Sequence, residues 1–249
     1  MIHAKICLLL LVVAVSLNAQ DSAMVHIASA VKAAEQHQFE EAVTQLTKAI
    51  DGGVKNPEVF YRRGRWNFQA GKAKASVEDF DAYLEKVPSR LKSLWERGIS
   101  CYYAGDFKAG AEQFVKYQTY HDSDVENAVW RYLCQLPTDG KVKARKDMLP
   151  IKGDSRIPMM EVYQLFKGEL SPEEVLKALT ESTSDETMKK TEAMHAHLYL
   201  GLYYDTEKQP KKAKEHIDLS VKQFEKGSYM WSVAVVHREH LKKARKKSE

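Results

Sequence analysis

Hydrophobic positions in this chain recur three or four residues apart, and few stretches alternate apolar and polar residues as strands do. This spacing predicts helices almost throughout. Two consecutive stretches repeat one pattern, FYRRGRWNFQAGKAKASVEDF from residue 60 and LWERGISCYYAGDFKAGAEQF from residue 94. Their shared residues recur at an interval of 34 positions: Gly64 and Gly98, Gly71 and Gly105, Phe80 and Phe114. Such a repeat, with glycine in its middle turn, predicts pairs of antiparallel helices.

Pairs of small residues mark the places where the predicted helices pack closely. A small residue is followed by a second one twelve positions later at four places: Ala30 and Ala42, Gly64 and Ser76, Gly98 and Gly110, Gly201 and Ala213. Sixteen positions after each first small residue stands a bulky one: Leu46, Phe80, Phe114 and Ile217. We expect the small residues to allow close approach of helices, and the bulky residue to fill the space between the two helices of a pair.

This arrangement resembles the tetratricopeptide repeat, which has a 34-residue period with small residues at its eighth and twentieth places. Arg63 and Arg97 depart from the pattern because leucine is usual there, whereas Leu200, Gly201 and Tyr204 follow it. The resemblance implies an all-α fold, a superhelix of stacked antiparallel helix pairs with an irregular helical middle region.

The repeat period is lost between residues 137 and 192, where turn-rich segments such as LPIKGDSRIP occur. One helix start is clear there, because Ser171, Pro172 and Glu174 form a capping-box pattern. We therefore expect a signal peptide at residues 1–19, repeats at 20–136, an irregular helical connecting region at 137–192, and a C-terminal repeat with a basic terminal helix at 193–249. The connecting region is either a degenerate repeat or an insertion that shapes a binding cleft.

Aromatic residues and an arginine share one predicted face of the first helices in two repeats: Tyr61, Arg65, Phe68, Trp95, Ile99 and Tyr102. In tetratricopeptide proteins these places usually face the inside of the superhelix. Stacked helices would join them into one concave strip that suits an extended or helical peptide. Two alternatives remain open, since helix-spaced aromatics commonly belong to a core: packing beneath the connecting region, or a dimer contact.

The N-terminal segment MIHAKICLLLLVVAVSLNAQ carries one lysine and a run of twelve residues, Ile6–Leu17, that is apolar except for Ser16. A membrane-spanning helix needs about twenty residues. A secretory signal cleaved after Ala19 therefore fits best, and the expected location is periplasmic or secreted, with no transmembrane segment in the mature chain. A lipoprotein would place a cysteine at the end of this run, whereas Cys7 lies near its start.

Charge is concentrated at the C-terminus, where Arg238 to Glu249 contains six Lys or Arg and two Glu. The net charge of the whole chain is only +4. Such a run is typical of a solvated helix end, and an acidic partner or an anionic surface is the alternative. No basic face continues into the body, so specific nucleic-acid recognition is not expected.

Motifs of catalysis are absent from the sequence: it has no phosphate loop, zinc-protease helix or nucleophile elbow. His195 and His197 should diverge, while His237 and His240 could share a helix face without a third ligand. We expect no metal and no cofactor. Cys101 and Cys134 fall on first helices of successive repeats, as buried thiols or, if geometry permits, as a disulfide.

Several segments, from RGISCYYAGDF through AVWRYLCQL and MEVYQLFKGELSPEEVLKAL to HLYLGLYYDTEKQPKKAKEHIDLSVK, together resemble the NlpI-type extracytoplasmic tetratricopeptide proteins. The resemblance implies an adaptor that brings cell-wall hydrolases to an envelope protease and tends to dimerise. The sequence thus predicts an exported, non-catalytic scaffold for protein or peptide partners. The alternative is a structural or assembly component of the envelope that acts mainly through self-association.

Overall fold

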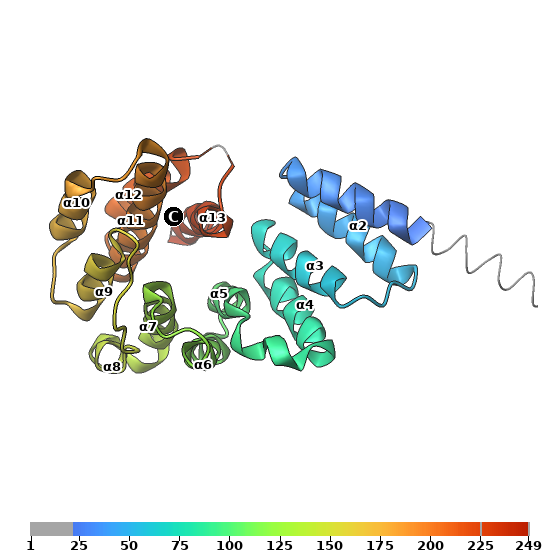
Figure 1. Cartoon of the computed structure of the whole chain (residues 1–249), viewed down its shortest axis with the longest axis horizontal. Coiled ribbons are helices and arrows are strands. Elements are labelled where there is room, and N and C mark those ends of the chain that lie inside the picture. Colours follow the sequence, from blue (N-terminus) through green and yellow to red (C-terminus); the bar gives the residue numbers. More distant parts are fainter. Residues whose placement is uncertain (1–21, 225, 249) are drawn as a thin grey trace, which may run out of the picture. The chain divides into compact units, whose positions relative to one another are not determined.

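The computed structural model describes residues 22–224 and 226–248, so the predicted signal peptide lies outside the described residues. Within them the secondary structure is helical, without strands, as predicted (Figure 1). None of these helices is long and apolar enough to cross a membrane. The chain divides into two compact units, unit 1 (Met1–Pro88) and unit 2 (Ser89–Glu249), and each is described by itself.

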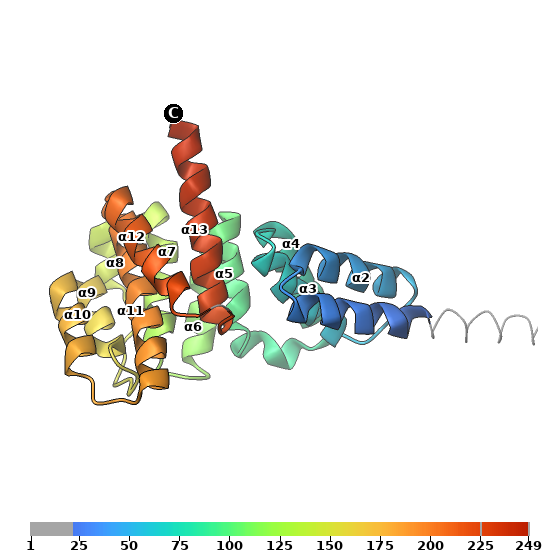
Figure 2. The ribbon, with the colours of Figure 1, turned by 90° about the horizontal axis from the view of Figure 1, so that it is seen from above.

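Unit 1 consists of stacked antiparallel helices (Figure 2). A helix at residues 22–35 is followed by α2 (Phe39–Asp51), α3 (Glu58–Gln69) and α4 (Ala73–Lys86). α3 packs against both α2 and α4. Ala30 and Leu46, which the repeat pattern singled out, meet in its core and form one buried cluster with Val59.

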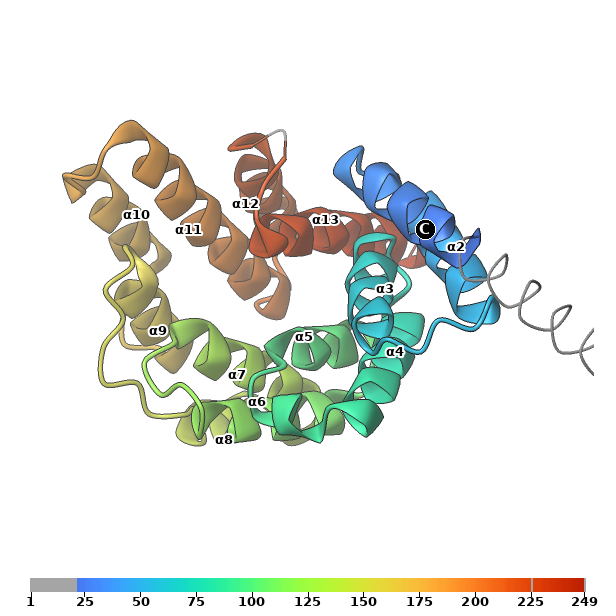
Figure 3. The same ribbon diagram turned by 45° about the vertical axis from the view of Figure 1, so that its right-hand side comes forward.

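Unit 2 continues the helix pairs and then departs from them (Figure 3). A short 3-10 helix, η1 (Pro88–Lys92), precedes the α-helices. These are α5 (Trp95–Ala104), α6 (Phe107–Gln118), α7 (Val125–Asp139), α8 (Lys141–Lys146), α9 (Met159–Lys167), α10 (Pro172–Glu181), α11 (Glu186–Thr206), α12 (Pro210–Lys222) and α13 (Tyr229–Ser248).

The helices of unit 2 pack mainly against their neighbours in sequence, as repeats do. α6 contacts α5 and α7, and α12 contacts α11 and α13. The connecting region is helical, and α9 packs against both α7 and α11. α11 begins at Glu186 and so extends across residue 192. The basic C-terminal end of α13 projects beyond the other helices of this unit (Figure 2).

Close helix approach at the repeat glycines is confirmed. A Cβ atom built on Gly98 would lie 2.6 Å from Cζ of Phe114, and one on Gly201 would lie 2.5 Å from Cγ1 of Ile217. The glycine and the bulky residue sixteen positions later are therefore in direct contact in both pairs. Because real Cβ atoms essentially never come this close, only glycine fits without movement of the partner.

Turns and caps also follow the sequence. Gly71 and Gly105 adopt left-handed φ angles of 74° and 82° at the ends of α3 and α5. Ser171 caps α10, since its hydroxyl accepts a hydrogen bond from N–H of Glu174 and the Glu174 carboxylate accepts one from N–H of Ser171. This is the predicted capping box, and it fixes the start of a helix inside the irregular region.

Candidate functional site

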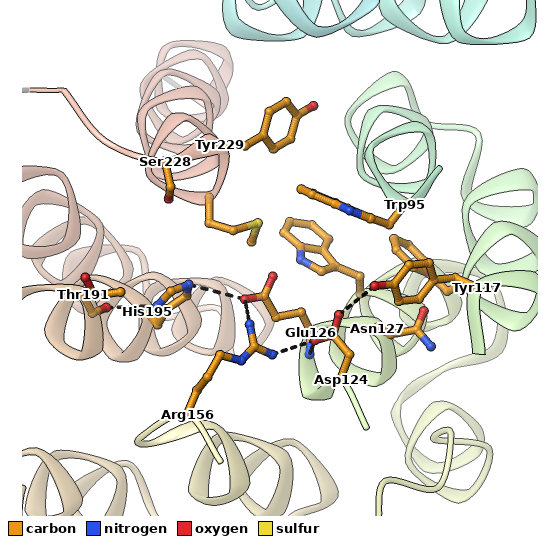
Figure 4. Close-up of a pocket in the computed structure, with 13 residues that line it drawn as sticks. Trp95, Tyr117, Asp124, Glu126, Asn127, Arg156, Thr191, His195, Ser228 and Tyr229 are labelled. Atoms are coloured by element: carbon orange, nitrogen blue, oxygen red, sulfur yellow. Dashed lines mark hydrogen bonds and ion pairs between the residues drawn. The ribbon is translucent and has the colours of Figure 1, made fainter. Parts of the chain in front are cut away.

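Unit 2 contains a cavity of about 380 Å³ between α5, α6, α7, α11 and the start of α13 (Figure 4). Its apolar wall comes from Trp95, Phe114, Tyr117, Trp130, Tyr229 and Met230. Its polar floor comes from Asp124, Glu126, Asn127, Arg156, Thr191, His195 and Ser228. The volume falls in the range of small-ligand and side-chain pockets.

The aromatic wall is built where α5 and α13 begin. Trp95 opens α5 and Tyr229 opens α13, and their rings meet edge to face, with centroids 5.2 Å apart at 88°. Trp95 is partly exposed, whereas Phe114 and Trp130 behind it are buried. The cavity therefore reaches the surface beside Trp95 and Ser228, which is exposed.

The floor is organised by Arg156, which lies in the turn-rich segment before α9. Its guanidinium forms ion pairs with Asp124 at 2.7 Å, Glu126 at 2.9 Å and Asp154 at 2.6 Å. Two of these carboxylates also cap α7: Asp124 accepts a hydrogen bond from N–H of Glu126, and Asp154 accepts one from N–H of Val125. The helix start thus holds the acidic groups in place.

Glu126 and His195 face each other across the floor, with Oε1 of Glu126 3.4 Å from Nε2 of His195. Nδ1 of His195 lies 3.0 Å from the carbonyl of Thr191, so the neutral ring donates from Nδ1 and leaves Nε2 as an acceptor. Burial, with the charge of Arg156, lowers the pKa of His195 to about 4. Burial, with the charge of Asp124, raises the pKa of Glu126 to about 7. The pair therefore holds one exchangeable proton near neutral pH.

Formal charge on this floor is negative. Asp124 and Glu126 of the floor, with Asp154 beside it, surround one guanidinium, and His195 is neutral at pH 7, so the charge is negative once Glu126 is ionised. Tyr117 adds a hydroxyl that donates to Asp124 at 3.3 Å. The site can therefore provide an acidic surface beneath aromatic rings.

Replacing Glu126 by glutamine should make stability less sensitive to alkaline pH. A folded pKa of about 7, above the ordinary value of 4.5, gives stability that is present in full below about pH 4.5 and is lost as pH rises through 7. Wild type should therefore lose about 1 kcal/mol more than Glu126→Gln between pH 6 and pH 8. Urea unfolding at both pH values measures this difference. Glu112→Gln, at an exposed position of α6, is the control and should behave like wild type. Equal pH dependence of stability in all three proteins would contradict the raised pKa of Glu126.

The predicted strip is only partly a surface in unit 2. Trp95 lines the cavity, but Ile99 has no exposed area and belongs to the core, because α5 packs against both α6 and α7. Tyr102 is partly exposed and its ring contacts the rings of Phe107 and Trp130. The expectation that Ile99 contacts a ligand is therefore wrong, since it is covered by protein.

In unit 1, Tyr61 and Arg65 form one partly exposed cluster. Nη1 of Arg65 donates to the hydroxyl of Tyr61 at 3.2 Å, and its guanidinium lies over the Tyr61 ring. Phe68 has no exposed area, so it is a core residue and its predicted contact with a ligand is also wrong. Tyr61 and Arg65 remain candidate binding residues of their own unit.

The histidine pairs behave as their spacing predicts. His195 faces Glu126, whereas Nδ1 of His197 lies 2.9 Å from Nδ1 of His216, so the first pair diverges. His237 and His240 stack with centroids 5.7 Å apart, and His237 is fully buried. No group of three or more His, Cys, Asp or Glu suited to a metal occurs among the described residues. Cys101 and Cys134 are buried thiols that do not form a disulfide.

Most residues of the floor were not identified from the sequence. One signal was available, because Asp124 directly precedes α7 and is a residue type typical of an N-cap. Nothing in the sequence pairs this acid with Arg156 or His195, which lie in a turn-rich segment and on a helix far along the chain. Tyr229 and Met230 likewise reach the cavity only through the fold.

No model of a known protein family matches the chain. Among solved structures, its fold is similar to that of a tetratricopeptide repeat protein from Parabacteroides merdae, with a TM-score of 0.51 and 12% sequence identity. The similarity covers 86% of this chain and 84% of that protein. At this identity it shows the fold alone. The chain has an all-α, tetratricopeptide-like fold.

Proposed function

We propose that this chain is an exported, non-catalytic adaptor that binds a segment of a partner protein in the cavity of unit 2. The cavity carries the proposal, because it combines a partly exposed tryptophan, further aromatic rings and a charged floor. Aromatic anchors of this kind contribute most of the energy at protein interfaces. The tetratricopeptide-like fold supports the same role.

Interactions within the floor support binding rather than catalysis. Arg156 is held by three carboxylates, and His195 is held by the carbonyl of Thr191 and faces Glu126. A nucleophilic mechanism would need a hydroxyl or thiol beside the histidine. The hydroxyl of Thr191, one turn before His195, instead donates to the carbonyl of Thr187. The hydroxyl of Ser228 accepts a hydrogen bond from N–H of Trp231 at the start of α13.

For the partner we propose an envelope protease or cell-wall hydrolase, on the basis of the resemblance to NlpI-type proteins. The second candidate is an envelope component that acts through self-association, for which the exposed Met24 and Val25 provide an apolar contact. Pull-down from intact cells, with mass spectrometry, distinguishes the two. An adaptor should recover unrelated proteins with wild type and lose them with Trp95→Ala, whereas recovery of this chain alone would favour self-association.

Export is tested separately. The mature protein should begin at or near Gln20, because the apolar run is too short to span a membrane and ends in a plausible cleavage site. N-terminal sequencing of protein made in its own host measures this. Recovery of an intact Met1 from the cytoplasm would contradict the proposed location.

A further inference from the structure

The chemistry of the cavity points to the kind of side chain that it takes. Its walls are rings and a thioether, which favour a long aliphatic side chain. Its floor holds more carboxylates than cations. Figure 4 shows the second carboxyl oxygen of Glu126 turned toward the cavity, away from Arg156 and His195. A ligand group that reaches this oxygen therefore meets negative charge.

We propose that the cavity holds the side chain of a lysine or arginine from an extended segment of the partner protein. Its aliphatic carbons pack against the sides of the Trp95 and Tyr229 rings that line the cavity, and its cationic end lies against Asp124 and Glu126. This inference rests on the proposed function, because it specifies what the peptide-binding cavity recognises.

Other side chains fit less well. A carboxylate would meet Asp124 and Glu126 without a free cation, since Arg156 already pairs with three acids. An apolar side chain would bury Glu126 further without compensating its charge. A lysine or arginine satisfies both parts of the cavity, because its stem packs on the rings while its charged end also gains from their π faces.

Binding of a cation should be linked to the proton on Glu126. The groups that face this acid are Asp124 on its own helix, Asp154 and Arg156 before α9, and His195 and Tyr199 on α11. α5 and α13 contribute Trp95, Tyr229 and Met230 to the cavity. Since burial raises the pKa of Glu126 to about 7, the ionised form that a cation prefers becomes dominant above neutral pH. The affinity for a peptide with a central lysine or arginine should therefore rise by up to roughly tenfold from pH 6 to pH 8.

The test uses the purified mature chain and pools of nine-residue peptides, randomised except for a central lysine, arginine, norleucine or glutamate. Binding by fluorescence anisotropy should favour the lysine and arginine pools at least fivefold over the norleucine and glutamate pools. Glu126→Gln combined with Asp124→Asn should abolish this preference, because asparagine and glutamine keep the helix cap and the shape of the floor but not the charge. Asp122→Asn removes a nearby exposed carboxylate outside the cavity and should keep the preference.

The possible failures are distinguishable. Binding that prefers norleucine or glutamate, or that keeps its basic preference in the double variant, overturns this inference but leaves a peptide-binding protein. No binding of any pool overturns the proposed function as well. A peptide of residues 241–249, LKKARKKSE, tests a second copy as the occupant. If it binds more than tenfold tighter than the lysine pool, the natural occupant is the basic tail of another chain, and the partner-protein proposal is wrong.

Discussion

Gly98→Leu is expected to lower the free energy of unfolding by about 1–3 kcal/mol through overpacking. The ring of Phe114 leaves no room, since its Cζ, Cε2 and Cε1 atoms would lie 2.6, 2.8 and 3.0 Å from a Cβ on Gly98. Leucine would need several further atoms in the same space. Phe114 is buried and lines the cavity, so the binding space is the open volume beside a displaced ring. The variant should therefore also bind the lysine pool more weakly.

Urea unfolding measures the first effect and peptide anisotropy the second. Gly153→Ala is the matched control, because a Cβ there meets nothing within 4 Å. Combining Gly98→Ala with Phe114→Leu should recover part of the loss seen for Gly98→Ala, as expected for residues in direct contact. Unchanged stability in Gly98→Leu would show that the assigned close approach is wrong.

Much of the fold could be predicted because the repeat places contacts at a fixed separation along the chain. The contact of Gly98 with Phe114 joins residues of one helix pair, and that of Gly201 with Ile217 joins another. Such contacts depend on residue size and helical period alone. The capping box at Ser171 also depends on neighbouring residues only, so it can be recognised from the sequence even within the irregular region.

The site was harder to predict because its residues come from distant elements. Arg156 has the sequence context of an ordinary loop residue, and it becomes the centre of the floor only when the chain brings Asp124 and Glu126 beside it. Helix periodicity places Trp95 and Ile99 on one face, but it does not show how far neighbouring helices cover that face. Here coverage leaves Trp95 partly exposed and Ile99 buried.

Trp95→Ala is expected to weaken binding of the lysine pool by roughly 1–4 kcal/mol while the fold persists. The side chain lies at the start of α5 and is partly exposed, and its ring contacts that of Tyr229, with centroids 5.2 Å apart. Its removal therefore opens the cavity wall rather than a sealed core. A buried tryptophan is different: Trp130 is 1% exposed, and Trp130→Ala should cost about 3–5 kcal/mol of stability.

Melting temperature and peptide affinity measured on the same Trp95→Ala sample separate the two roles of this residue. Val142→Ala removes an exposed apolar side chain outside the cavity, and it should change neither quantity. If Trp95→Ala lowers the melting temperature as much as Trp130→Ala, and its folded fraction binds as wild type does, then Trp95 is a packing residue. The cavity would then have no aromatic side chain that anchors a partner, because its wall would serve only the packing of this protein. Self-association would become the better explanation of the function.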